Sequence, residues 1–158
     1  MCWAPPLALA FASLAAPLAA QEQGLALQPH LRADAILARE AAGHLAAGLS
    51  LPVARYVRVD LTVGGGIGER PAGGTRGAGR ADLLGRFVLD PEFTREWAMY
   101  GAAGVGVIAA GGTTRELLLV ALGAEGPRWG GAVPFAEVGL GGGIRLGVGV
   151  RRARAGQR

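Results

Sequence analysis

The feature that most limits what this chain can fold into is the strict alternation in "RYVRVDLTVGGGIGER", residues 55–70. Successive side chains of an extended strand point to opposite faces, so this segment has one aliphatic face and one polar face. The aliphatic face holds Val57, Val59, Leu61 and Val63, and the polar face holds Arg58, Asp60 and Thr62. A soluble protein buries the aliphatic face, whereas a membrane barrel turns it toward lipid. Which face lies inside therefore decides the class of protein.

Alternation with a period of two continues along most of the chain from Leu31 onward and predicts eight strands. They span residues 31–40, 44–53, 55–70, 79–89, 97–109, 115–125, 132–141 and 144–151. Single-chain bacterial barrels have an even number of antiparallel strands, starting from eight, and each strand needs about 9 to 11 residues to cross the membrane. For the first two segments, an Ala-rich helix over 33–49 is the alternative, although Gly43 and Gly48 interrupt it.

The first twenty residues, "MCWAPPLALAFASLAAPLAA", are an apolar stretch that ends in small residues. This pattern is typical of a cleavable secretory signal peptide, and the prolines within it disfavour the competing interpretation, a membrane-spanning helix. Cleavage would remove Cys2, the one cysteine, so we expect neither a disulfide nor a cysteine metal site in the mature chain. The predicted organisation is a signal peptide over 1–20, a short periplasmic segment over 21–30, a β-barrel over 31–152 and a basic tail over 153–158.

Opposite charges recur two residues apart on one face of the predicted strands. The motif Arg-x-Asp occurs at Arg32 and Asp34, at Arg58 and Asp60, and at Arg80 and Asp82. Side chains just fill the interior of an eight-stranded barrel, so paired charges could close it, and glycines on the same face would leave room for long arginines. The predicted interior charge network comprises Arg32, Asp34, Arg58, Asp60, Arg80, Asp82, Arg86, Glu125, Glu137 and Arg145. Ordinary surface salt bridges are the other interpretation of this pattern.

The aromatic residues that follow the leader gather near three predicted connections, at 54–55, 90–96 and 126–131. An even strand count would place these connections at the periplasmic end, and aromatic side chains ring membrane interfaces in known barrels. The predicted aromatic girdle comprises Tyr56, Phe87, Phe93, Trp97, Tyr100, Trp129 and Phe135.

The stretches "GRADLLGRFVLDP" and "EVGLGGGIRLGVGV", with the leader and the strand pattern, resemble the small bacterial outer-membrane β-barrel group, of the OmpA-like or OmpX-like eight-stranded kind. The resemblance covers residues 31–152. It implies an all-β fold, an eight-stranded antiparallel transmembrane β-barrel, inserted into the outer membrane by the barrel-assembly machinery and surrounded by outer-membrane lipid. Barrels of this group usually end in an aromatic residue, whereas this chain ends "GVGVRRARAGQR".

Motifs for catalysis and cofactor binding do not match this sequence. Ser50 in "GLSLP" lacks the second glycine of a nucleophile elbow, and His44 lies roughly 20 Å away along the same strand. No spacing of His30, His44 and the carboxylates suits a metal, and the glycine runs match no phosphate-binding loop. The arginines are scattered rather than gathered into a basic patch, despite a net charge of +4. We therefore predict no catalytic residue, no metal, no cofactor and no nucleic-acid partner.

Three functional hypotheses follow. The first is a non-enzymatic outer-membrane barrel, closed inside by Arg, Asp and Glu pairs, with a structural or surface-interaction role. The second is a secreted soluble β-barrel or sandwich that binds a small apolar ligand, with the valine face inside. The third is a lipid-modifying membrane enzyme, which would need polar residues clustered at one rim.

Overall fold

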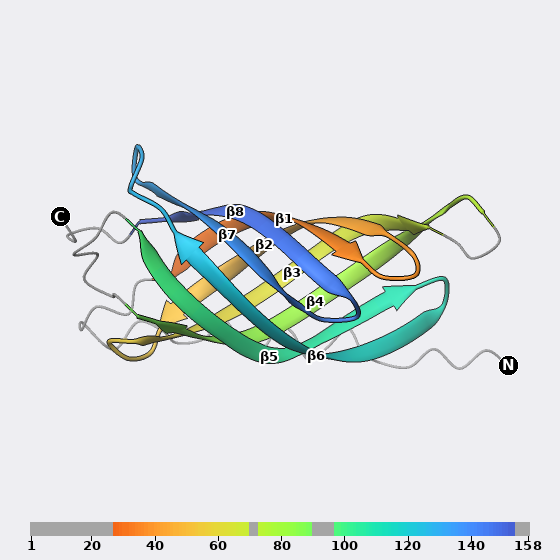
Figure 1. Ribbon diagram of the computed structural model, residues 1–158, viewed down its shortest axis with the longest axis horizontal. Helices are drawn as coiled ribbons and strands as arrows, with labels where there is room; N and C mark the ends of the chain where they lie inside the picture. The colour runs from red at the N-terminus through yellow and green to blue at the C-terminus, as the bar shows by residue number, and fades with distance from the viewer. Residues whose placement is uncertain (1–26, 70–72, 90–96, 154–158) are drawn as a thin grey trace, which may run out of the picture.

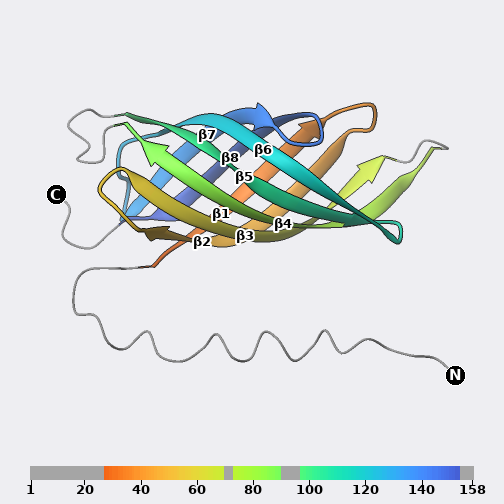
Figure 2. The ribbon, with the colours of Figure 1, turned by 90° about the horizontal axis from the view of Figure 1, so that it is seen from below.

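Eight antiparallel strands form one closed barrel in the computed structural model, which describes residues 27–69, 73–89 and 97–153. The strands are β1 (Gln28–Leu37), β2 (Ala42–Pro52), β3 (Val57–Glu69), β4 (Thr75–Val88), β5 (Ala98–Ala110), β6 (Thr113–Glu125), β7 (Ala132–Leu140) and β8 (Ile144–Arg152). Each strand pairs with the next along the chain, and β1 also pairs with β8, which closes the cylinder (Figures 1 and 2). Every strand therefore has a neighbour on both sides, although the distal part of β6, residues 113–119, extends beyond its pairing with β7.

The hairpins at one end of the barrel project to different heights. We call the end where β1 begins and β8 ends the terminal end, and the opposite end the distal end. Strands β3 to β6 have 13 or 14 residues each, whereas β1, β2, β7 and β8 have 9 to 11. The β3–β4 and β5–β6 hairpins therefore project beyond the β7–β8 hairpin at the distal end (Figure 1).

The aliphatic face of the strands lies on the outside of the barrel. On β3, Leu61 and Val63 are 51% and 60% exposed. The alternate residues Asp60 and Thr62 are only 1% and 3% exposed. Exposed large aliphatic or aromatic side chains occur on all eight strands. The fold is thus inverted relative to a soluble protein, and the alternative of a soluble barrel or sandwich with its valines inside is wrong.

All eight predicted strands are present, and their ends differ from the predicted ones by at most four residues. The barrel begins at Gln28 rather than at residue 31, so the predicted segment 21–30 is three residues too long. The helical alternative over 33–49 is wrong, because β1 and β2 pair with each other and with neighbours on both sides. Residues 1–20 of the predicted signal peptide lie outside the described residues, as does residue 154 onward of the predicted tail. Within the described ranges, no helix is long and apolar enough to cross a membrane.

Candidate functional site: the barrel interior and its distal mouth

All ten residues of the predicted charge network face the barrel interior. Each is at most 7% exposed, although the ten come from six different strands. They are Arg32, Asp34, Arg58, Asp60, Arg80, Asp82, Arg86, Glu125, Glu137 and Arg145. Burial of an ion requires a partner, because an unpaired charge in a low-dielectric interior is strongly destabilising. The interior meets this requirement with two groups of ion pairs.

The first group, which we call the Asp34 cluster, spans β1, β4, β7 and β8. It contains Arg32, Asp34, Arg80, Asp82, Glu137 and Arg145. Arg32 Nη2 lies 2.6 Å from Asp34 Oδ1 and also pairs with Glu137. Arg145 reaches across from β8, with its Nε 3.1 Å from Asp34 Oδ1 and its Nη1 3.2 Å from Asp82 Oδ2. The cluster therefore ties opposite walls of the barrel together.

The second group, the Glu125 cluster, lies nearer the terminal end and is centred on one fully buried carboxylate. Glu125 accepts ion pairs from Arg58 at 2.8 Å, Arg151 at 2.7 Å and Arg86 at 3.3 Å. Arg86 also pairs with Asp60, at 2.7 Å between Nη2 and Oδ2. The cluster thus comprises Arg58, Asp60, Arg86, Glu125 and Arg151, and three of its arginines share the Glu125 carboxylate.

One tyrosine joins the two clusters. The Tyr100 hydroxyl donates a hydrogen bond of 3.0 Å to Glu137 Oε2, and its ring lies 4.1 Å below the guanidinium carbon of Arg86. Such a contact adds a cation–π attraction to the ion pairs. The interior is thus a connected network of charged and aromatic side chains rather than two separate clusters.

Interior glycines make room for this network. A Cβ at Gly147 would lie 2.5 Å from Arg32 Nη2 and 2.7 Å from Asp34 Oδ1. A Cβ at Gly106 would lie 2.5 Å from Asp82 Oδ1, and one at Gly123 would lie 2.3 Å from the Tyr100 ring. Long side chains from one strand therefore occupy the volume that glycines leave free on the neighbouring strand, where Asp34 pairs with Gly147, Asp82 with Gly106 and Tyr100 with Gly123.

The predicted aromatic girdle is wrong for two of its seven members. Tyr100 is 1% exposed and Phe135 is 4% exposed, so both side chains lie in the interior. Both residues lie near the terminal end, but each occupies an inward position of its strand. Tyr100 is two residues from the buried Ala98, and Phe135 is two residues from the buried Glu137, so each pair shares one face. Height along the barrel and facing are independent properties, and the prediction used only the first.

The remaining girdle residues that the structure describes are exposed at or near the terminal end. Tyr56, Phe87, Trp97 and Trp129 are between 40% and 86% exposed, and the rings of Tyr56 and Phe87 stack with centroids 5.8 Å apart. Phe93 lies outside the described residues.

Several interior residues were missed by the sequence prediction. The largest omission is Arg151, which pairs with Glu125 and also hydrogen-bonds to Gln28. His30 is buried as well, and its Nε2 lies 3.0 Å from the Thr62 hydroxyl. Both omissions carried a signal in the sequence, because each lies an even number of residues from a predicted interior charge on its own strand.

The residues weighed in the sequence for nucleophilic catalysis and metal binding do not come together among the described residues. Ser50 Oγ and both ring nitrogens of His44 have no hydrogen-bond partner within this part of the chain, so the two residues do not form a nucleophile–base pair. The described ranges also contain no group of three or more His, Cys, Asp or Glu side chains that could hold a metal ion.

A hollow opens at the distal mouth of the barrel, above the Asp34 cluster. Its volume is about 420 Å³, and its lining combines Arg39, Glu40, Arg76 and Arg115 with aliphatic side chains. Arg76 Nη2 lies 3.0 Å from Glu40 Oε2, and both side chains are about one-third exposed. This hollow, which we call the distal cup, is the polar opening of the barrel.

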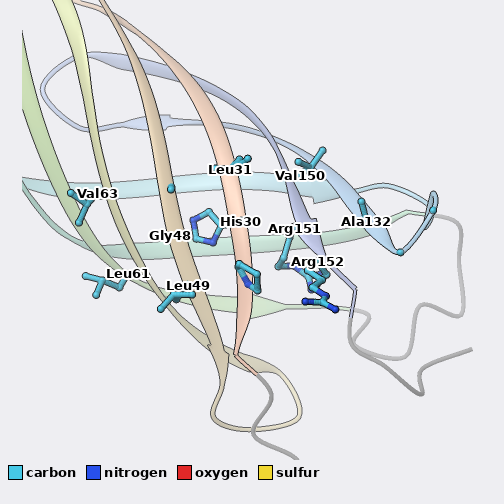
Figure 3. Close-up of a pocket in the computed structure, with 14 residues that line it drawn as sticks. His30, Leu31, Gly48, Leu49, Leu61, Val63, Ala132, Val150, Arg151 and Arg152 are labelled. Carbon is cyan, nitrogen blue, oxygen red and sulfur yellow. The ribbon is translucent and has the colours of Figure 1, made fainter. Parts of the chain in front are cut away.

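A second hollow, of about 850 Å³, lies on the outside of the barrel toward the terminal end. Figure 3 shows Leu31, Leu49, Leu61, Val63 and Val150 around it, on neighbouring strands, with Arg152 at its edge. Its lining is almost entirely apolar because it belongs to the aliphatic outer face. It has the character of a surface for hydrocarbon rather than of a reaction site.

No protein-family model matches the chain, and no curated protein matches it significantly. Solved structures do match in fold. The N-terminal β-barrel domain of Pseudomonas aeruginosa OprF aligns with a TM-score of 0.60 and 11% identity, over 79% of this chain and 96% of that domain. Neisserial surface protein A, NspA, aligns with a TM-score of 0.55 and 12% identity, over 82% of this chain and 99% of NspA. A de novo designed transmembrane β-barrel aligns with a TM-score of 0.54 and 13% identity, over 84% and 97% of the two chains.

The chain has the fold of the small outer-membrane β-barrels. This confirms the predicted fold class, an eight-stranded antiparallel barrel, and the resemblance on which part of that prediction rested. At these identities the likeness concerns the fold alone.

Proposed function

We propose that this protein is a non-enzymatic outer-membrane barrel with a closed interior and a structural or surface-interaction role. The observation that carries the proposal is the pairing of a continuous aliphatic exterior with a buried, ion-paired interior. In water, the exposed side chains on all eight strands would form an apolar surface far larger than the patches that soluble monomers present. Surrounded by hydrocarbon, the same surface is fully compatible with its environment.

The closed interior argues against a role as an open pore. An eight-stranded barrel has an interior that side chains fill, and here the two ion-pair clusters and Tyr100 cross it. Passage of a hydrated solute would require several buried ion pairs to separate together. A structural role in the membrane, or contacts made by the distal end, fit this arrangement better than transport.

The partners that we propose follow from the location. Outer-membrane lipid would cover the aliphatic exterior, including the hollow beside Leu31 and Val150. Insertion would require the barrel-assembly machinery. Neither the interior nor the outer face offers a nucleic acid a basic surface, because the interior arginines are paired with carboxylates and the outer face is aliphatic.

Fractionation of cells that express the full chain tests the proposal. We expect the protein to sediment with outer membranes and to migrate faster on an SDS gel before boiling than after it, because a closed barrel resists SDS. Leu61→Arg should reduce the heat-sensitive fraction, since it places a charge on the aliphatic face, whereas Arg152→Gln should behave as the wild type does. Recovery of the protein in the soluble periplasmic fraction would overturn the proposal.

A further inference from the structure

The distal cup has a chemical character that the closed barrel does not explain. Arg76 and Arg115 occupy inward positions of β4 and β6, and Arg39 lies in the turn between β1 and β2. One carboxylate, Glu40, lines the cup with them, and its ion pair is with Arg76. Within the described part of the chain, neither Arg39 nor Arg115 forms an ion pair. The lining therefore carries an excess of positive charge that other side chains do not neutralise.

The cup is also apolar at its base. Ile36, Ile108 and Leu117 line it, and Ile36 is 4% exposed. Leu119, which is 2% exposed, faces inward one register step below Leu117. Beneath these residues the Asp34 cluster closes the barrel. The cup is therefore a blind hollow with cationic walls and an aliphatic floor, rather than the entrance of a channel.

The height of the surrounding hairpins gives the cup a wall on one side. Strands β4, β5 and β6, which supply Arg76, Ile108 and Arg115, belong to the hairpins that project farthest, whereas Gly142 marks the short β7–β8 turn. A ligand could thus enter over the β7–β8 side, with Arg76 and Arg115 on the projecting hairpins and Arg39 on the β1–β2 connection. A volume of about 420 Å³ suits a small organic molecule rather than a polymer.

We propose that the distal cup binds a small amphipathic oxyanion: a phosphate or sulfate group attached to a short apolar chain. Guanidinium groups donate paired hydrogen bonds to tetrahedral oxyanions, and Arg39 and Arg115 are available to do so. The apolar part would lie on Ile36, Ile108 and Leu117. The inference rests on the proposed function, because the cup is open to water only if the distal end stands clear of the membrane.

Titration of the full chain in nanodiscs of phosphatidylcholine provides the test, with butyl phosphate, inorganic phosphate and butanol as the three probes. We expect saturable binding of butyl phosphate, weaker binding of inorganic phosphate and none of butanol in calorimetry. A second titration, in nanodiscs that also contain phosphatidate, identifies the natural source. Weaker apparent binding there indicates that a lipid head group competes for the cup, and unchanged binding indicates a soluble ester.

Four variants separate the cup from general charge attraction. Arg39→Gln and Arg115→Gln should each weaken butyl phosphate binding about tenfold, because each removes a charge-assisted hydrogen bond. Glu40→Gln should tighten binding, because it frees Arg76. Ile108→Asn should weaken binding of butyl phosphate but leave that of inorganic phosphate unchanged. Arg152→Gln removes the same charge at the terminal end and should have no effect.

Absence of saturable butyl phosphate binding, or equal binding by the wild type and the Arg39→Gln/Arg115→Gln double variant, would overturn the inference. Each variant is first checked for heat-dependent gel mobility, so a folding defect is recognised independently. If the wild type keeps this mobility but does not bind butyl phosphate, only the inference about the distal cup is contradicted. If the wild type is absent from outer membranes, the proposed function is contradicted as well.

Discussion

The barrel interior and the distal cup use the same kinds of side chain in opposite ways. Arg80 and Arg76 lie four residues apart on the inward face of β4. Arg80 is 5% exposed and pairs with Asp82, whereas the Arg76 side chain is 33% exposed and pairs with Glu40. In the interior every arginine of the two clusters pairs with at least one buried carboxylate, and Arg32, Arg86 and Arg145 each pair with two or more. In the cup three arginines line the hollow with one carboxylate. A buried ion pair thus contributes to the stability of the barrel, whereas the arginines of an exposed site remain accessible to a ligand.

The largest expected effect comes from removing a carboxylate from the buried ion pairs of the interior. Glu125→Gln should lower the free energy of unfolding by about 3 to 5 kcal/mol, because Arg58, Arg86 and Arg151 lose a shared buried partner. Glu40→Gln removes the exposed pair and should cost about 0 to 1 kcal/mol. Urea unfolding of the two variants in lipid vesicles gives both values. Similar values for both variants would mean that burial does not set the strength of these pairs.

A charge on the outer face should cost nearly as much. Leu61→Arg should destabilise the barrel by about 2 to 4 kcal/mol, because Leu61 lies outward near the middle of β3. Val53→Arg, one residue beyond the terminal end of β2, is the matched change near the membrane interface and should cost about 0 to 1 kcal/mol. The same vesicle experiment measures both, and a larger cost at Val53 would place the membrane elsewhere along the barrel.

The third prediction separates the interior aromatic residues from the exposed ones. Tyr100→Phe should cost about 1.5 to 3 kcal/mol, because it removes the hydrogen bond to the Glu137 carboxylate. Tyr56→Phe, an identical change at an exposed site, should change the free energy of unfolding by less than about 0.5 kcal/mol. If the two variants were equally stable, Tyr100 would not link the two clusters.

The smallest effect concerns close approach of the strands. A Cβ at Gly104 would lie 2.0 Å from the Leu83 carbonyl oxygen and 2.9 Å from the Leu84 Cα, so Gly104→Ala should cost about 1 to 3 kcal/mol. Gly79→Ala, where a Cβ meets nothing within 4 Å, should be neutral or slightly stabilising. Thermal unfolding of both variants shows the difference. Equal stability of the two variants would indicate that β4 and β5 can shift apart to accept a methyl group at position 104.

The faces of the strands could be predicted from the sequence because they depend only on alternation. Arg58 and Asp60 occupy inward positions as expected, and the same rule applied without exception would have found His30, Arg151, Tyr100 and Phe135. The missed residues and the two misplaced aromatics therefore reflect incomplete use of a local signal. For a residue near a turn, the position along the chain gives its height in the barrel, whereas its odd or even place in the strand decides which face it occupies.

The ion pairs between strands could not be predicted, because they depend on the stagger and curvature of the closed barrel. Two of the three Arg-x-Asp motifs do form ion pairs, at Arg32 with Asp34 and Arg80 with Asp82. In the third motif each charge has a partner on another strand instead: Asp60 pairs with Arg86 on the adjacent β4, and Arg58 pairs with Glu125 on β6. The distal cup likewise depends on which hairpins project, which alternation does not specify.

The most direct test of the central claim compares two adjacent positions on β3. Leu61→Cys and Thr62→Cys, prepared separately in lipid vesicles, differ in which face of the strand carries the thiol. A fluorescent label at Leu61→Cys should be quenched by nitroxide-bearing lipids but not by aqueous iodide, and Thr62→Cys should react only after unfolding. Quenching of the Leu61→Cys label by iodide, with rapid labelling of Thr62→Cys, would contradict a barrel with its aliphatic face in lipid.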